Sequence, residues 1–315
     1  MLQVRYFGIN YKDVASIPVG YERQIEMFSL DFEEYLWAIG IDKKAINSVK
    51  EYFDKKEKVP IAIHESMIKY IREYITVGGM PEVVKTFVDT SNHKEVYDVQ
   101  KKIIDSYLDD IYKYASTSEK IKVKNVYLSI PKQLAKANKK FQFSFVEKRT
   151  TSRKYENSIE WLRDANLVNY CNNVNNPIIP LSAYIRDNFF KIYLNDIGLL
   201  TAMYEYEVKD LIITDKLKGD AKGGIYENLI ADNLIKKGFN LFYYKNENNS
   251  HEVEFLIIKE GTVVPVEVKS SNGPTISLNE FLKREDVLFG YKFISGNVGV
   301  DGKKITLPLY MMLFI

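Results

Sequence analysis

The sequence predicts a multidomain chain of mixed class, part α+β and part α/β. Helical spacing of apolar residues dominates its first part, helix signals followed by strand-like runs fill its middle, and helices and apolar strands alternate in its last part. At 315 residues, with 46% apolar and 27% charged residues, the chain has enough apolar mass for two or three domains. We therefore divide it into residues 1–88, 89–205 and 206–315.

The first part is predicted to be a small helical bundle. Asp31 precedes an apolar and acidic stretch at 32–40 and can cap a helix there. A second helix is expected over 65–75, where Met67 and Ile71 lie on one face, and it should stop at the Gly-Gly-Met-Pro break that begins at Gly78.

The middle part is predicted to be a winged-helix-like domain. A long helix over 95–115 is followed by a basic tract, and Thr151 or Ser152 can cap a second helix over 153–166. Strand-like runs then occupy 167–171, 178–185 and 188–196. Helix, basic loop, helix and β-hairpin is the order of a winged helix.

The last part reads as an α/β unit with a mixed sheet. A helix is expected over 223–238, followed by strands over 240–246, 252–261 and 262–270 and by later strands over 293–297 and 305–314.

The basic tract between Lys120 and Lys154 holds eleven basic residues and one acid, Glu147, whereas the whole chain has a net charge of +2. Such a patch can hold nucleic-acid phosphates, so DNA is the expected partner, although a solvated surface explains a lysine-rich stretch equally well. Nothing in the tract indicates base specificity. The candidate nucleic-acid-binding residues are Lys132, Lys136, Lys139, Lys140, Lys148, Arg149, Arg153 and Lys154.

Three carboxylates and a lysine form the candidate catalytic group. Glu227 lies on the helix over 223–238, Glu254 on one strand, and Glu267 and Lys269 on the next, where alternation puts the last two on one face. If the strands pair as a hairpin, Glu254 and Glu267 can bind Mg²⁺ beside the lysine. The alternative is a solvated strand face on which acids and bases alternate.

Several functional classes are excluded or disfavoured. The single cysteine, Cys171, rules out an internal disulfide framework, and the three histidines lack zinc-site spacing. No apolar run approaches the roughly 20 residues that a membrane span needs, so we expect a cytoplasmic chain without a membrane partner. The one Gly-Lys step, Gly302-Lys303, has Asn297 where a P-loop needs its first glycine, so no ATP site is expected.

Many segments, in order and over nearly the whole chain, resemble a large family of predicted prokaryotic AAA-type ATPases whose C-terminal half is a domain of unknown function. They are SIPVG (16–20), FSLDFEEYLWAIG (28–40), YITVGGMPEVV (74–84), SIPKQLAKANKKFQFS (129–144), PLSAY (180–184), FFKIYLNDIGLL (189–200), YENLIADNL (226–234), EVEFLI (252–257) and VPVEVKS (264–270).

The resemblance implies an AAA-lid-like helical part and a C-terminal PD-(D/E)XK, restriction-endonuclease-like sheet. In that family the ATP-binding core precedes the SIPVG motif, so the chain is expected to lack this core, either as a natural truncation or as a fragment. Residues 1–25 are then expected to be displaced, swapped or packed anew.

The resemblance also assigns the helix acid to Glu227, the first metal acid to Glu254 and the E-x-K pair to Glu267 and Lys269. Relatives commonly have Asp at the position of Glu254, and the longer side chain can impair metal geometry. Tyr21 stands where relatives commonly have Arg.

Three interpretations follow. The leading one is a nucleic-acid-binding protein with a Mg²⁺-dependent endonuclease site. The second is a catalytically inert DNA-binding or assembly module that acts with an ATPase partner or as a homo-oligomer. The third is a folded remnant of a truncated gene. The sequence does not identify the substrate or the biological process.

Overall fold

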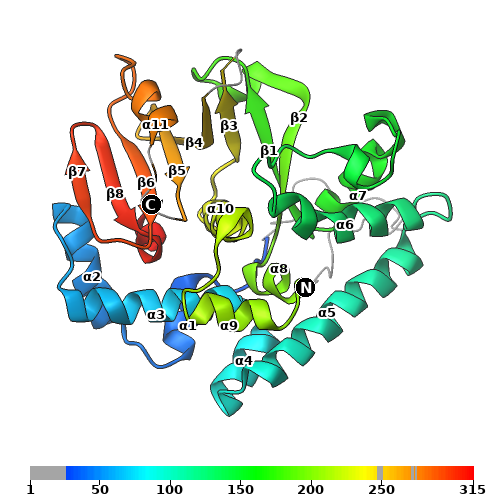
Figure 1. Ribbon diagram of the computed structural model, residues 1–315, viewed down its shortest axis with the longest axis horizontal. Helices are drawn as coiled ribbons and strands as arrows, with labels where there is room; N and C mark the ends of the chain where they lie inside the picture. Colours follow the sequence, from blue (N-terminus) through cyan, green and yellow to red (C-terminus); the bar gives the residue numbers. More distant parts are fainter. Residues whose placement is uncertain (1–25, 247–250, 271–272, 274) are drawn as a thin grey trace, which may run out of the picture.

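The computed structural model describes residues 26–246, 251–270, 273 and 275–315. The SIPVG motif and the expected rearrangement of residues 1–25 lie outside these ranges. Figure 1 shows the sheet spread across one side of the molecule, helices α1 to α5 along the other, and α10 between them.

The predicted helical N-terminal part is confirmed. Residues 26–88 hold α1 (Phe32–Ala38), α2 (Lys43–Lys55), α3 (Ile61–Val77) and most of α4 (Pro81–Thr90). Helices α5 (His93–Tyr114) and α6 (Lys120–Leu134) follow in the predicted middle part. Asp31 caps α1 in a reciprocal capping box with Glu34. Helix α3 ends at Gly78, as predicted, and a Cβ on the next residue, Gly79, would lie 2.0 Å from the carbonyl oxygen of Leu30.

The middle of the chain differs from the prediction in three places. It contains η1 (Phe143–Phe145), η2 (Ser152–Lys154), α7 (Glu156–Asp164), β1 (Val168–Val174), η3 (Leu181–Tyr184) and β2 (Ile185–Leu194). The first half of the basic tract is helix α6 rather than a loop. Neither Thr151 nor Ser152 caps α7, whose N-cap residue is Tyr155. The run over 178–185 is not a strand, because Pro180 lacks an N–H for a ladder and a 3₁₀ turn follows it.

Helix α8 (Ile197–Ala202) ends the middle part. The last part contains α9 (Glu207–Ile213), α10 (Gly219–Lys236), β3 (Phe242–Lys245), β4 (Glu252–Lys259) and β5 (Thr262–Val268). These are followed by α11 (Ile276–Phe281), β6 (Gly290–Ile294), β7 (Gly299–Asp301), β8 (Lys304–Pro308) and η4 (Leu309–Phe314). The predicted mixed sheet is confirmed.

In the described part of the chain, eight strands form one sheet with the order β2-β1-β3-β4-β5-β6-β8-β7. The β1–β2 hairpin joins it because β1 pairs in parallel with β3 over Asn172–Val174 and Phe242–Tyr244. Strands β3, β4 and β5 are antiparallel neighbours, and β5, β6 and β8 are parallel. The division at residue 205 stays a prediction, and one sheet crosses it.

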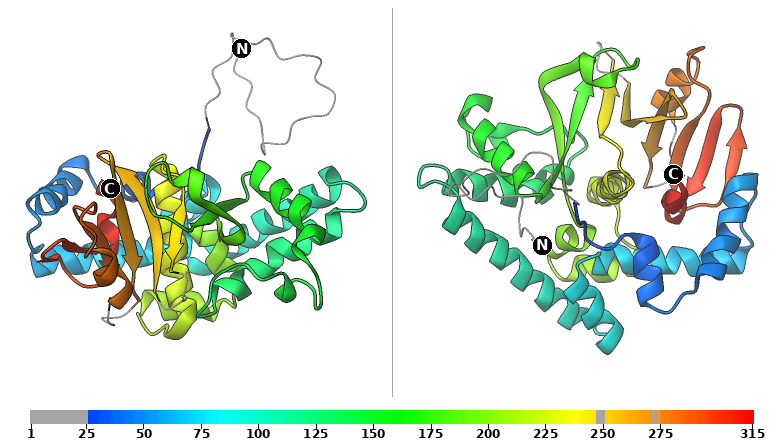
Figure 2. Two further views of the ribbon diagram at one scale, coloured as in Figure 1. Left: turned by 90° about the horizontal axis from the view of Figure 1, so that it is seen from above. Right: turned by 180° about the vertical axis from the view of Figure 1, so that it is seen from behind.

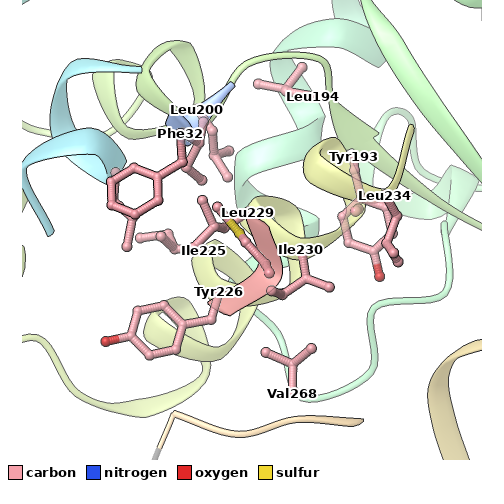
Figure 3. Packing of buried hydrophobic residues seen from close by; sticks show 14 of the residues in the cluster. Phe32, Tyr193, Leu194, Leu200, Ile225, Tyr226, Leu229, Ile230, Leu234 and Val268 are labelled. Atoms are coloured by element: carbon pink, nitrogen blue, oxygen red, sulfur yellow. The ribbon is translucent and has the colours of Figure 1, made fainter. Parts of the chain in front are cut away.

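Helix α10 lies at the centre of the larger hydrophobic core. Figure 3 shows its residues Ile225, Leu229 and Ile230 among Phe32 of α1 and Val268 of β5. A smaller core forms where α11 packs on β4 and β5. Figure 2 shows from two further sides how α10 runs between the sheet and the helices. This arrangement places the N-terminal half of α10 beside the strands that carry the candidate site.

Candidate functional site

Strands β4 and β5 bring three of the four predicted catalytic residues together. The two strands pair in antiparallel register from Phe255 opposite Val266, and extending this register by one residue puts Glu254 opposite Glu267. The Lys269 Nζ atom lies 2.8 Å from the Glu267 Oε1 atom and 3.2 Å from the Glu254 Oε1 atom. One ammonium group therefore pairs with both carboxylates.

A β-bulge places Glu254 in this position. Val253 of β4 pairs with Tyr244 of β3, and Leu256 of β4 pairs with Phe242 of β3. These two pairs are three residues apart along β4 but only two residues apart along β3. The extra residue falls at Glu254 or Phe255, and such bulges re-aim a side chain beside functional sites. The sequence carries no visible signal for it.

Both carboxylates are buried and only half satisfied. Glu254 is 9% exposed and Glu267 is 1% exposed, and the Oε2 atom of each has no hydrogen-bond partner among the described residues. Burial, together with the charges of Glu227 and Glu267, raises the pKa of Glu254 to about 8 despite the opposing charge of Lys269. Burial also raises the pKa of Glu267, although Lys269 opposes this shift. Burying two carboxyl groups that each leave one oxygen without a hydrogen bond therefore lowers the stability of the folded chain.

Glu227 belongs to an adjacent ion-pair group on α10. Its Oε1 atom lies 2.9 Å from the Lys139 Nζ atom, and its Oε2 atom lies 3.6 Å from the Lys191 Nζ atom. The Tyr193 hydroxyl donates to Glu227 Oε2 at 3.2 Å. Because Glu227 raises the pKa of Glu254, the two groups interact electrostatically.

Lys191 is a functional candidate that sequence reasoning missed. It is 1% exposed, and its Nζ atom also lies 2.7 Å from the Glu252 Oε1 atom. Burial lowers the pKa of Lys191, but the negative charges of Glu252, Glu227 and Glu254 outweigh burial and raise it well above its ordinary value. The available signal was a lysine inside the otherwise apolar run FFKIYL (189–194) at the end of β2, since a buried lysine needs an anionic partner.

The donor set fits a hard divalent cation in part. The described residues contain no group of three or more His, Cys, Asp and Glu side chains that could hold a metal. Glu254 and Glu267 nevertheless offer two buried carboxylate oxygens without partners. Proteins bind Mg²⁺ through one or two carboxylates, with waters and substrate phosphates completing the octahedron, so Glu254 and Glu267 could hold such an ion.

The candidate nucleic-acid-binding residues do not form one uniform surface. Lys132, Lys136, Lys148, Arg149 and Arg153 are exposed. Lys154 is also exposed and pairs with Glu147 at 2.6 Å. Lys139, in contrast, is turned inward to Glu227, and Lys140 lies over the ring of Phe189.

Two family models match parts of the chain. Residues 68–210 match a domain of unknown function (DUF8612), and residues 222–307 match another domain of unknown function (DUF4143). The second match contains Glu227, Glu254, Glu267 and Lys269.

Among curated proteins, the chain is similar to "Uncharacterized protein MJ1544" of Methanocaldococcus jannaschii, with 27% identity over 261 residues. The match covers 79% of this chain and 50% of that protein, so the chain spans about half the length of this relative. No solved structure matches significantly. Across residues 26–246, 251–270 and 275–315, no helix is both long and apolar enough to cross a membrane.

Proposed function

We propose that the chain is a nucleic-acid-binding protein that cleaves phosphodiesters with a divalent cation held between β4 and β5. The observation that carries this proposal is the pair Glu254 and Glu267, opposite each other, buried, sharing Lys269 and each keeping one oxygen without a partner. Buried carboxylates that cost stability are expected where they serve a function.

Each residue then has a defined role. Glu254 and Glu267 bind the cation, Mg²⁺, which when bound polarises the scissile phosphate and lowers the pKa of its water. Lys269 positions the attacking water and stabilises the charge that develops on the phosphate. Glu227, held by Lys139 and Lys191, is a positioning residue that keeps Lys191 charged beside the carboxylates.

The proposed partner is DNA, held through its backbone. The exposed basic residues at 132–136 and 148–154 supply charges that suit phosphates without selecting a base. The resemblance to predicted AAA-type ATPases supports a lid-like N-terminal part and a PD-(D/E)XK nuclease-like sheet. The order of helix, basic tract, helix and hairpin supports a winged-helix-like middle. The single cysteine, Cys171, suits a reducing cytoplasm, which is the location that we propose.

A second candidate function is an inert DNA-binding or assembly module, acting with an ATPase partner or as a homo-oligomer. Two observations favour it. Glu254 reaches one methylene further than the aspartate common among relatives, and Lys269 already pairs with both carboxylates. In this module the ammonium replaces the cation and the site contributes structure only.

Cleavage and metal binding test the first proposal together. Wild type, Glu267→Gln and Lys269→Met are incubated with labelled duplex and single-stranded DNA in Mg²⁺ or Mn²⁺, and metal binding is followed by calorimetry. Glu280→Gln is the matched control, because Glu280 of α11 is an exposed acid that pairs with Lys283. Its activity should equal that of the wild type.

The expected result is metal-dependent cutting that falls at least about a hundredfold in both site variants, since each removes a charge that acts on the transition state. Glu267→Gln should also lose metal binding, whereas Lys269→Met should keep it. If the wild type binds neither metal and cuts neither DNA, the catalytic proposal fails. DNA binding without cutting would favour the inert module.

A further inference from the structure

A cavity of about 300 Å³ opens at the β2-β1-β3-β4 part of the sheet, with Glu252 of β4 in its wall. Its walls come from the chain segment after α6 and from four strands. Arg186 and Phe189 belong to β2, Asn173 to β1, and Tyr243 and Lys245 to β3. Lys140 closes it from the segment after α6. The cavity is several times larger than the roughly 30 Å³ that one water occupies, so it has room for a small organic ligand.

Three cations converge on this cavity. The Lys140 Nζ atom lies 3.3 Å from the centre of the Phe189 ring, and the Arg186 guanidinium carbon lies 4.4 Å from the same centre. Phe189 thus holds two like charges close together. Burial, followed by the charges of Arg186 and Lys245, lowers the pKa of Lys140. Three positive charges held this close together favour the binding of an anion in the cavity.

The one carboxylate in the cavity wall is already neutralised. Glu252 pairs with Lys191 at 2.7 Å and with Lys245 at 3.1 Å. Burial raises the pKa of Glu252, but Lys191 and Lys245 outweigh burial and lower it to about 2. Within the described ranges, no ion pair satisfies Lys140 or Arg186, so both remain available to an external anion.

Asn173 supplies a second, independent indication of a ligand. It lines the cavity at 1% exposure, and its Nδ2 atom donates to the carbonyl oxygen of Tyr243 at 3.4 Å. Its Oδ1 atom accepts no hydrogen bond among the described residues. A buried amide oxygen without a donor is costly, and a ligand N–H or O–H would satisfy it.

We propose that this cavity binds a nucleoside phosphate, with the phosphate on Lys140 and Arg186 and a base or sugar donor on Asn173. Arginine beside lysine suits a phosphate monoester, because the guanidinium makes two parallel hydrogen bonds and the ammonium adds charge. The same chemistry belongs to a free mononucleotide and to the phosphorylated 5′ end of a strand. Binding here does not depend on the proposed cleavage, because Glu254 and Glu267 do not line the cavity.

The test is calorimetry on the full chain with the four nucleoside 5′-monophosphates, the matching nucleosides and inorganic phosphate. Arg186→Gln should weaken every phosphate-bearing ligand by about tenfold to a hundredfold. Arg163→Gln is the control, because Arg163 is an exposed arginine on α7 that does not line the cavity. Affinity in the control should match the wild type.

Asn173→Ala separates the two halves of the site. It should weaken nucleoside phosphates by about tenfold and leave inorganic phosphate unchanged. Circular dichroism of each variant shows whether it folds, and Arg186→Gln tests the proposal even if Asn173→Ala does not fold, since Arg186 is only partly buried.

A short oligonucleotide with and without a 5′-phosphate distinguishes the two sources. Preference for the phosphorylated strand over the mononucleotide identifies a strand end, and the reverse identifies a free nucleotide. Equal binding by wild type and Arg186→Gln, or no binding of any phosphate-bearing ligand, overturns the proposal. Glu267→Gln should keep nucleotide binding while it loses cleavage, so failure of one proposal does not imply failure of the other.

Discussion

At the scale of single residues, the chain carries several charges in places where water cannot reach them. Lys209 is an example outside the candidate site. It is completely buried, and its ammonium donates to the carbonyl oxygen of Thr76 and to the Thr201 hydroxyl, where α3 ends against α8. Burial lowers its pKa to about 7, with only partial compensation from Asp196.

Lys209 should therefore make stability depend on pH. The pKa of Lys209 is lower in the folded chain than in the unfolded chain. Its contribution to the free energy of unfolding is therefore fully present above its unfolded-state pKa, near 10.4, and is lost as the pH falls toward 7. The free energy of unfolding should rise with pH across this window by up to about 1.4 kcal/mol per unit relative to Lys209→Met. Urea unfolding at pH 7, 8, 9 and 10 measures the difference, and a constant difference would contradict the shift.

The Lys209→Met change leaves the α3 terminus satisfied, because the Gln100 amide also donates to the Thr76 carbonyl oxygen. Lys85→Met is a suitable control, since Lys85 is exposed and pairs with Asp89 on its own helix. Its effect should be small and nearly independent of pH over the same range.

The residues of the candidate site could be predicted only in part. Strand alternation placed Glu267 and Lys269 on one face, and the expected hairpin brought Glu254 to them. The roles of Lys139 and Lys191 could not be predicted, because their pairing with Glu227 joins segments that are far apart in sequence. The cavity was missed for the same reason.

At the scale of elements, the most informative helices are those with strong local signals. The start of α1 at Asp31 and the end of α3 at Gly78 follow from capping chemistry and glycine geometry. The basic tract was predicted to be a loop because its many charges were read as solvated surface and its helical spacing of apolar residues was overlooked. Its first half is α6, which presents Val123, Val126 and Ile130 to the core.

The α1 cap yields a prediction at this scale. Asp31→Ala should lower the free energy of unfolding by about 1 kcal/mol, because it removes the side-chain acceptor for the Glu34 N–H. Asp31→Asn keeps an acceptor and should lose clearly less. The thermal midpoints of the three proteins measure this order, and an equal loss in both variants would point instead to the Lys237 ion pair at 3.4 Å.

Helix α10 gives a sharper prediction because two adjacent glycines face different surroundings. A Cβ on Gly224 would lie 2.1 Å from the Leu134 carbonyl oxygen of α6, whereas a Cβ on Gly223 would meet only the end of Lys139 at 3.9 Å. Gly224→Ala should therefore destabilise by about 1–3 kcal/mol through overpacking. Gly223→Ala should stabilise by about 0.5–1 kcal/mol through helix propensity. Chemical denaturation of both variants tests the close approach, and equal effects would refute it.

At the scale of the whole molecule, the sheet unites parts of the chain that the sequence suggested were separate. A local pattern identifies a hairpin but not its neighbour, so the parallel pairing of β1 with β3 was not predictable from periodicity. The larger core likewise extends from Phe32 of α1 to Leu313 of η4. Since no boundary separates these contacts, the described part of the chain should behave as one folding unit.

Cooperative unfolding tests this expectation, and the two tryptophans make the test local. Trp37 lies in α1 and Trp161 in α7. The Trp161→Phe variant keeps Trp37 as a fluorescent reporter in the first part, and the Trp37→Phe variant keeps Trp161 as a reporter in the middle part. Far-UV circular dichroism reports the sheet and helices together. All three signals should give the same urea midpoint, because a shared core unfolds in one step. Separate midpoints for Trp37 and Trp161 would instead show that the first and middle parts unfold independently, as the three-part division of the sequence implies.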